Sequence, residues 1–146
     1  MIYIASDHGG FKLKQALKKY LPELGYQFED LGPSDFDVED DYPDFAKLVA
    51  DKVRQQSESE NEHLGILICS TGLGMCLAAN KFSGIRAINV MDVFMAQQGR
   101  EHLNSNVLCL GERILAEEKA KEIVRIWLQA RFSGEARHIR RLQKLG

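Results

Sequence analysis

Short apolar runs alternate with longer segments of helical periodicity along all 146 residues of this chain. The apolar runs occupy residues 2–5, 26–31, 65–69, 85–90 and 107–110. The helical segments occupy residues 11–21, 42–53, 75–80, 93–101 and 116–130. Such alternation is typical of βαβ units, whose strands run parallel and whose helices cover both faces of the sheet. We therefore predict an α/β protein with a five-stranded parallel sheet as the middle layer of a three-layer αβα fold.

Length and charge exclude several classes of protein. A chain of 146 residues has the size of one domain, so we predict a single domain over residues 1–146. The 19 basic and 21 acidic residues leave a net charge of −2, which argues against nucleic-acid binding. No apolar run approaches the ~20 residues that cross a membrane, and the first residues turn polar too early for a signal peptide. We expect a cytoplasmic protein without nucleic-acid or membrane partners.

The segment from Cys69 to Gly74 reads Cys-Ser-Thr-Gly-Leu-Gly and lies where a buried strand gives way to a helix. In a Rossmann-like sheet, ligands bind beyond the carboxyl ends of the strands, and this turn lies at that edge. Its backbone N–H groups suit a phosphate, a carboxylate or a developing oxyanion. No Gly-Lys-Ser/Thr follows, which excludes a P-loop, and Leu77 replaces the third glycine of a dinucleotide fingerprint. A dinucleotide site with Asp92 as the ribose-binding acid remains an alternative.

The three cysteines are suited neither to disulfides nor to a zinc site. They are odd in number and lie in apolar stretches, and we expect no metal and no other cofactor. Cys69 lies at the mouth of the glycine-rich turn, where helix N-terminal amides favour a thiolate that can act as base or nucleophile. The simpler alternative for Cys69 is a small buried apolar residue, and that is what we expect of Cys76 and Cys109.

Two histidines occupy positions suited to proton transfer. His8 follows Asp7 at the end of the first strand, so both lie at the same sheet edge as Cys69, although a surface polar pair would look the same. His102 follows the fourth helical segment, where it could exchange protons near neutral pH or cap the helix. His63 lies beside the charged connector 55–62 and is expected in solvent.

The last segment, residues 134–146, is the one clearly basic stretch. Arg137 and Arg141 are four residues apart and would share one helix face, with His138 beside them. Arginine forks suit a phosphate dianion, and Arg113 could join them. A solvated helix or an RNA-binding tail is the alternative. An anion clamp, a base, oxyanion-binding amides and a proton-exchanging histidine are together what sugar-phosphate isomerisation needs.

The order of these motifs resembles one family. The matching positions are 6–11 with Lys14, 41–43, 65–74, 78–82, 84–87, His102, 106–108, Gly111 with Arg113, and 137–138 with Arg141. Over nearly the whole chain, the sequence is similar to the ribose-5-phosphate isomerase B family, which also contains the galactose-6-phosphate isomerase subunits. The resemblance implies interconversion of D-ribose 5-phosphate and D-ribulose 5-phosphate without metal. It also implies a homodimer or homotetramer with active sites shared between subunits.

The resemblance further implies a role for each candidate residue. Cys69 would be the base that moves a proton between C1 and C2, and Thr71 with nearby amides would stabilise the cis-enediolate oxygen. His102, helped by Asp7, would open the furanose ring, and segment 134–146 would contact a partner subunit. The positions implied to bind substrate are His8, Tyr42, Ser70, Gly72, Gly74, Asn104, Arg113, Arg137, His138 and Arg141.

Two positions depart from the family's usual pattern. Ser70 stands where the family usually has glycine, and the turn still works unless it needs φ > 0 there. Leu103 stands where the family has an asparagine that would hydrogen-bond the sugar. Two alternatives therefore stay open. One is an isomerase of a six-carbon phospho-sugar, such as allose 6-phosphate or galactose 6-phosphate, and the other is a non-catalytic sugar-phosphate-binding module.

Overall fold

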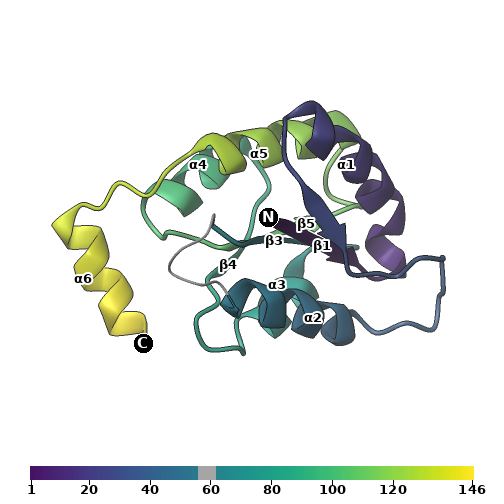
Figure 1. Ribbon diagram of the computed structural model, residues 1–146, viewed down its shortest axis with the longest axis horizontal. Coiled ribbons are helices and arrows are strands. Elements are labelled where there is room, and N and C mark those ends of the chain that lie inside the picture. The colour runs from purple at the N-terminus through teal and green to yellow at the C-terminus, as the bar shows by residue number, and fades with distance from the viewer. Residues whose placement is uncertain (56–61) are drawn as a thin grey trace.

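The computed structural model, which describes residues 1–55 and 62–146, contains one sheet of five parallel strands between two layers of helices (Figure 1). The strands are β1 (Ile2–Ser6), β2 (Phe28–Asp30), β3 (Leu64–Cys69), β4 (Ala87–Asn89) and β5 (Val107–Gly111), in the spatial order β2-β1-β3-β5-β4. The helices are η1 (His8–Gly10, a 3-10 turn), α1 (Phe11–Glu23), α2 (Tyr42–Arg54), α3 (Leu73–Ala79), α4 (Val93–Glu101), α5 (Glu117–Gln129) and α6 (Ala136–Leu145). The predicted α/β class and parallel sheet are confirmed.

The sheet is apolar on both faces because helices cover both. Along β3, Ile66 and Ile68 belong to the core shared with α1, α4 and α5, whereas Leu67 and Cys69 belong to the core shared with α2 and α3. Successive residues of a strand point to opposite faces, so one continuous apolar run contributes to two cores. The side chain of Cys69 therefore lies on the α2–α3 side of the sheet, at the last position of β3.

The two edge strands, β2 and β4, are shorter than the apolar runs at 26–31 and 85–90 that predicted them. An edge strand has a hydrogen-bonded neighbour on one side only, so its ends are less well held. At β4 the side chain of Asn80 occupies the free side: its Oδ1 accepts from Ala87 N and its Nδ2 donates to Ala87 O, both at 2.9 Å. The amide group of Asn80 thus takes the place of a sixth strand at this point.

Helix α6 stands apart from the sheet. Figure 1 shows it at the end of the molecule opposite the loop that leads into α2. His138 is its one buried residue, whereas Ile139 and Leu145 are exposed. An amphipathic helix with an uncovered apolar face is typical of contact with another molecule. Within the described part of the chain, no helix has the length and apolar content needed to span a membrane.

Candidate active site

Cys69 ends β3 and is 5% exposed. Its Sγ accepts a hydrogen bond of 3.1 Å from the backbone N–H of Gly72, and an N–H donor stabilises negative charge on the sulfur. Gly72 has φ +82°, a left-handed conformation that glycine adopts without strain, and an added Cβ would collide with the side-chain oxygen of Asn89. The turn therefore needs glycine at this position to aim its amide at the thiol.

The rest of the glycine-rich turn lies open beside this thiol. Thr71 is exposed, and its Oγ1 accepts from Leu73 N at 3.3 Å. Ser70 has negative φ, so the serine introduces no backbone strain. A Cβ added to Gly74 would lie 2.9 Å from the ring of Tyr42, so the missing side chain lets that ring lie against the turn from the start of α2. The tyrosine and the turn together form one wall of the site.

Asp7 follows β1 at the same edge and is 7% exposed. Among the described residues its Oδ1 has no hydrogen-bond partner, and a Cβ added to Gly9 would lie 3.2 Å from that oxygen and 3.0 Å from Ser70 N. Burial raises the pKa of Asp7, while the neighbouring His8 opposes the shift. A buried carboxyl group with a free oxygen beside the turn is suited to exchange a proton with a sugar hydroxyl.

His8 is held by Asp40, a residue that the sequence analysis did not single out. Asp40 Oδ1 lies 2.7 Å from His8 Nδ1 and accepts from His8 N at 2.9 Å. This contact raises the pKa of His8. The one sequence signal was the acidic character of the loop before Tyr42, which ends at the ligand-binding edge. The contact with Asp40 thus favours a positive charge on His8, at the sheet edge where a phosphate is expected.

We expect Asp40→Asn to shift the pH dependence of substrate binding. Because Asp40 raises the pKa of His8 above its ordinary value, the imidazolium persists to higher pH, and phosphate affinity falls only as pH rises through the raised pKa. In Asp40→Asn this loss of affinity, measured as a severalfold increase in KM, begins at a lower pH than in the wild type. Steady-state KM against pH and NMR titration of His8 measure the shift. Asp37→Asn in the same loop is the matched control, and an equal shift there would contradict the role of Asp40.

Arg113 reaches the same edge from β5. Its backbone N–H donates to Ser70 O at 3.0 Å, and Glu112 N donates to Cys69 O at 2.9 Å. These bonds tie the segment after β5 to the turn after β3 and leave the Arg113 side chain exposed. The described structure therefore brings one group of predicted residues together: Asp7, His8, Tyr42, Cys69, Ser70, Thr71, Gly72, Gly74 and Arg113. We call this group the carboxyl-edge cluster.

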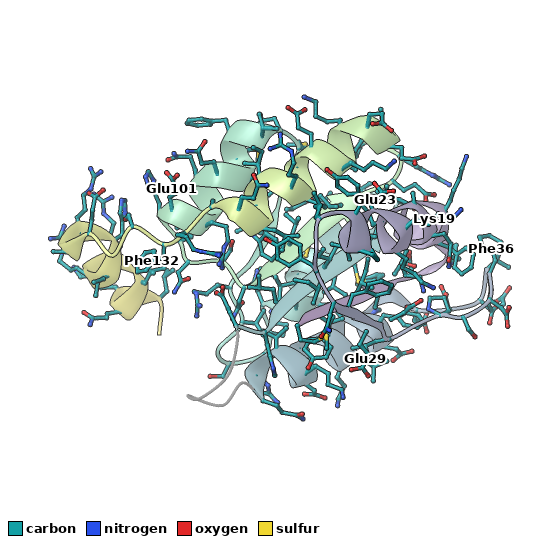
Figure 2. All side chains as sticks on the ribbon, turned by 45° about the horizontal axis from the view of Figure 1, so that its top comes forward. Lys19, Glu23, Glu29, Phe36, Glu101 and Phe132 are labelled. Carbon is teal, nitrogen blue, oxygen red and sulfur yellow. The ribbon has the colours of Figure 1, made fainter. Side chains whose placement is uncertain are left out.

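The other predicted residues form a second cluster elsewhere. His102 follows α4, and its ring stacks on that of His138 in α6 at 4.1 Å between centroids and 18° between planes. The residues of this second cluster are His102, Asn104, Arg137, His138 and Arg141. In Figure 2, Glu101 and α6 lie at one end of the molecule and Phe36, in the loop leading into α2, at the other. His102 lies between α4 and β5, at the amino ends of the strands, whereas Cys69 is at the carboxyl end of β3. A single chain therefore does not bring His102 and the helix stacked on it to Cys69.

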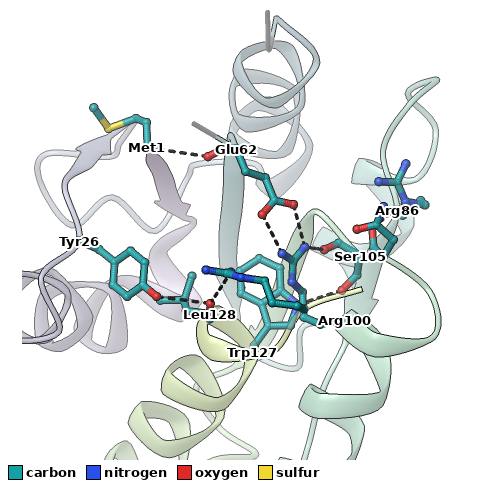
Figure 3. Close-up of polar contacts among 10 residues, drawn as sticks. Met1, Tyr26, Glu62, Arg86, Arg100, Ser105, Trp127 and Leu128 are labelled. Atoms are coloured by element: carbon teal, nitrogen blue, oxygen red, sulfur yellow. Dashed lines mark hydrogen bonds and ion pairs between the residues drawn. The ribbon is translucent and has the colours of Figure 1, made fainter. Parts of the chain in front are cut away.

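A network of buried contacts holds the turn between His102 and β5 (Figure 3). Asn104 has φ +46°, and its carbonyl accepts from Arg86 Nε at 2.7 Å. Arg100 donates to the carbonyl of Ser105 at 2.6 Å, and Trp127 Nε1 donates to Ser105 Oγ at 2.9 Å. No local sequence pattern links a helix arginine to a tryptophan on the next helix, so the sequence does not predict this network. The network fixes the backbone from which His102 projects.

The basic helix keeps its two predicted arginines in solvent. Arg137 and Arg141 are both exposed, and Arg137 Nε donates to Glu135 Oε2 at 2.9 Å. His138 is 4% exposed, its Nε2 has no partner among the described residues, and burial next to His102 lowers its pKa. Two exposed guanidinium groups, of which that of Arg137 is paired with Glu135, lie on the same helix as the stacked His138 ring and can receive an anion that comes from outside the chain.

Three further expectations need correction or narrowing. Cys109 is buried as predicted, but Cys76 is half-buried and lines a cavity. His63 is partly buried, not free in solvent, and its ring contacts that of Tyr3 edge-on at 5.4 Å. The carboxylate of Asp92 accepts from Met95 N at 2.8 Å and so caps α4, which argues against its use as a ribose-binding acid. Residues 56–61 of the charged connector lie outside the described part.

The chain is similar to known proteins over nearly its full length. Residues 2–145 match the ribose/galactose isomerase family. Ribose-5-phosphate isomerase B of Escherichia coli K12 is 40% identical over 144 residues, which are 99% of this chain and 93% of that protein. D-erythrulose-4-phosphate isomerase of Pectobacterium atrosepticum is 37% identical over 133 residues, 91% of this chain and 85% of that protein.

A solved structure is similar to the same extent. Ribose-5-phosphate isomerase B from Mycoplasma genitalium, crystallised with bound ribulose-5-phosphate, has a TM-score of 0.92 and 47% identity, covering 99% of this chain and 92% of that chain. Ribose 5-phosphate isomerase B from Thermotoga maritima has a TM-score of 0.90 and 42% identity, covering 99% and 95%. By sequence and by fold, the chain belongs to the ribose/galactose isomerase family.

Proposed function

We propose that this protein is an aldose-ketose isomerase that interconverts D-ribose 5-phosphate and D-ribulose 5-phosphate through a cis-enediolate. The observation that carries the proposal is the Cys69 thiol, which lies at the end of a buried strand and accepts from the Gly72 amide at 3.1 Å. The relatives named ribose-5-phosphate isomerase B, one of them with bound ribulose-5-phosphate, support the choice of substrate. We place the enzyme in the cytoplasm, acting on small sugar phosphates.

The chemistry follows from the carboxyl-edge cluster. The Cys69 thiolate removes the proton from C2 of the open-chain aldose, the electrons of that bond form the C1–C2 double bond, and charge moves onto O1. The N–H groups of the turn, with the hydroxyl of Thr71, stabilise that oxygen, and each such donor contributes about 3 kcal/mol in well-studied enzymes. A proton then moves from O2 to O1, and Cys69 returns its proton to C1, which completes the ketose. Phosphate binding by His8 and Arg113 orients the reacting carbons.

We infer that a second copy of the chain completes each site. His102, Arg137, His138 and Arg141 belong to the second cluster, at the sheet edge opposite Cys69, so a partner is the simplest source of these groups. Large apolar side chains are exposed on the elements around the edge strand β4: Leu73, Leu77, Met91, Phe94 and Leu103. An exposed apolar patch that begins at Leu73, inside the glycine-rich turn, is typical of a subunit interface. A homodimer is the smallest assembly that meets this need, and a homotetramer would contain two such pairs.

In this arrangement the single domain 1–146 uses its basic segment 134–146 to reach the partner's carboxyl-edge cluster. Arg137, His138 and Arg141 would join His8 and Arg113 around the phosphate. His102 would open the furanose ring by moving a proton at the ring oxygen, and Asp7, whose pKa burial raises, would take part at the sugar hydroxyl. Asn104, held by Arg86, would face the same sugar.

Leu103 is the position that favours a second candidate substrate. It is 45% exposed and follows His102 directly, so it would face the sugar without a hydrogen-bonding group. Such a site would select a different phospho-sugar, and the relative that acts on D-erythrulose 4-phosphate is an example within the family. The apolar side chain of Leu103 would suit a longer sugar whose carbons beyond C3 lie against it. A six-carbon phospho-sugar is therefore the alternative substrate.

A substrate panel tests the proposal and its alternative. We expect turnover of D-ribose 5-phosphate in a coupled assay with purified protein, at higher kcat/KM than with allose 6-phosphate, galactose 6-phosphate or erythrulose 4-phosphate. Leu103→Asn should raise kcat/KM for ribose 5-phosphate by about tenfold, the value of one sugar hydrogen bond. Preference for allose 6-phosphate would support the six-carbon alternative. Tight binding without turnover of any sugar would favour the binding module.

A further inference from the structure

Arg100, in the last turn of α4, is a charged side chain that is only 1% exposed. Its guanidinium group donates to the two carboxylate oxygens of Glu62 at 3.1 and 2.8 Å, and Nη1 also donates to the carbonyl of Ser105 at 2.6 Å. The centre of the same group lies 5.5 Å from the ring centroid of Trp127. Arg100 thus joins the segment before β3, the turn after α4 and helix α5 (Figure 3).

Stability alone gives no reason to keep a charge at this position. Burial of a guanidinium group is costly, and apolar side chains of similar size often replace a buried ion pair without loss of stability. The carboxylate partner, Glu62, is itself 41% exposed, so water can solvate it. An apolar side chain could not direct hydrogen bonds, whereas the planar fork of an arginine fixes the geometry of the groups that it contacts. We infer that Arg100 sets the position of the turn over residues 102–105.

The backbone of this turn is held at successive residues. Asn104 N donates to the carbonyl of Arg100 at 3.1 Å, and the carbonyl of Asn104 accepts from Arg86 Nε at 2.7 Å. The next carbonyl, that of Ser105, accepts from the Arg100 side chain. His102 lies at the start of the turn, and its ring stacks on that of His138 in α6. The backbone from which the His102 ring projects is therefore fixed by two arginines.

We propose that Arg100, closed on Glu62 and Ser105, is a positioning residue for His102 in the opening of the furanose ring. This inference rests on the proposed isomerase function. In ring opening, Asp7 takes the proton of the C1 hydroxyl, a C1–O1 double bond forms, and the C1–O4 bond breaks. Its electrons go to O4, which receives a proton from His102. A displacement of a catalytic group by about 1 Å costs about a hundredfold in rate.

The two sugar phosphates differ in their need for this step. Ribose 5-phosphate closes to a furanose through O4, so its aldehyde must be released before Cys69 can take the proton from C2. Ribulose 5-phosphate has its carbonyl at C2, and the O5 that would close a five-membered ring carries the phosphate. Its C1 proton therefore exchanges with solvent through the enediolate without any ring opening. A positioning role in ring opening predicts a loss with ribose 5-phosphate alone.

The test compares these two rates in Arg100→Lys, which keeps the charge but lacks the fork that reaches Glu62 and Ser105 together. We expect kcat for ribose 5-phosphate to fall by about tenfold, as for a partial displacement of His102. Exchange of the C1 proton of ribulose 5-phosphate in deuterium oxide, followed by NMR, should stay at the wild-type rate. Glu62→Ala leaves the core intact and should give the same selective loss. Arg125→Lys, on α5, is the matched control and should change neither rate.

A second measurement does not depend on the reaction. The imidazole proton signals of His102 and His138 report how the stacked rings lie, because each ring shifts the signals of the other. We expect these signals to move in Arg100→Lys and Glu62→Ala, and to stay in place in Arg125→Lys.

Equal losses in both rates would show that Arg100 supports the whole site, and unchanged kcat in both network variants would show that His102 needs no such support. Either result would overturn the proposal. If the wild type turned over no sugar phosphate, the proposed function and the ring-opening step would fail together. The imidazole signals would then still decide whether Arg100 positions His102, and unmoved signals would remove that role as well.

Discussion

Cys69→Ala should lower kcat for ribose 5-phosphate by about a thousandfold, the usual contribution of a positioned general base. The thiol is the one group at the end of β3 that can take a proton from C2, and alanine replaces it without changing the backbone that carries the turn. KM should change little, because in the proposed site His8 and the arginines, and not Cys69, bind the phosphate. Steady-state kinetics and the exchange of the C2 proton with solvent measure both effects.

The matched control is Cys76→Ser, which removes another thiol from the same core and should leave kcat within about twofold of the wild type. Equal thermal unfolding midpoints for the two variants would show that folding is intact. Full isomerase activity in Cys69→Ala would remove the assigned base and leave the cysteine as a core residue. Loss of activity in both variants alike would indicate that packing, and not proton transfer, limits the reaction.

Mixing two inactive variants should recover isomerase activity if each site is shared between subunits. In a hybrid of Cys69→Ala with Arg137→Ala/Arg141→Ala, one site combines an intact Cys69 with intact arginines from the partner, and the other site lacks both. Random assembly of equal amounts makes half of the dimers hybrid, so recovery of about one quarter of wild-type activity is expected. The coupled assay after joint refolding measures it, with native mass spectrometry to prove hybrid formation.

A second mixture serves as the control for this experiment. His102 lies in the same cluster as the two arginines, because its ring stacks on His138 of the same helix. A hybrid of His102→Ala with Arg137→Ala/Arg141→Ala therefore leaves every site with one defect and should stay inactive. Recovery in this control, or no recovery in the first mixture despite hybrids, would argue for a site within one chain.

Much of the carboxyl-edge cluster followed from sequence alone. The alternation of apolar runs and helical segments predicted parallel strands, and parallel strands end at a common edge, so Asp7 and Cys69 were expected at the same edge. That they are neighbours depends on the pairing of β1 with β3, which the structure decided. The edge strands β2 and β4 are shorter than predicted. An edge strand is hydrogen-bonded on one side only, so fewer residues of its apolar run are held in the sheet. His102 precedes β5, so it lies at the opposite edge, and its distance from Cys69 is a consequence of the same topology.

No local sequence pattern predicts the contacts between side chains from distant segments. The sequence by itself determined the sheet, the glycine-rich turn after β3 and the family resemblance, because strand and helix periodicity and turn glycines are local properties. Only the tertiary structure decided that Asp40 holds His8, that His102 stacks on His138, and that Trp127 donates to Ser105. These pairs depend on how loops and helices from separate βα units pack together, and no pattern within one segment encodes that packing.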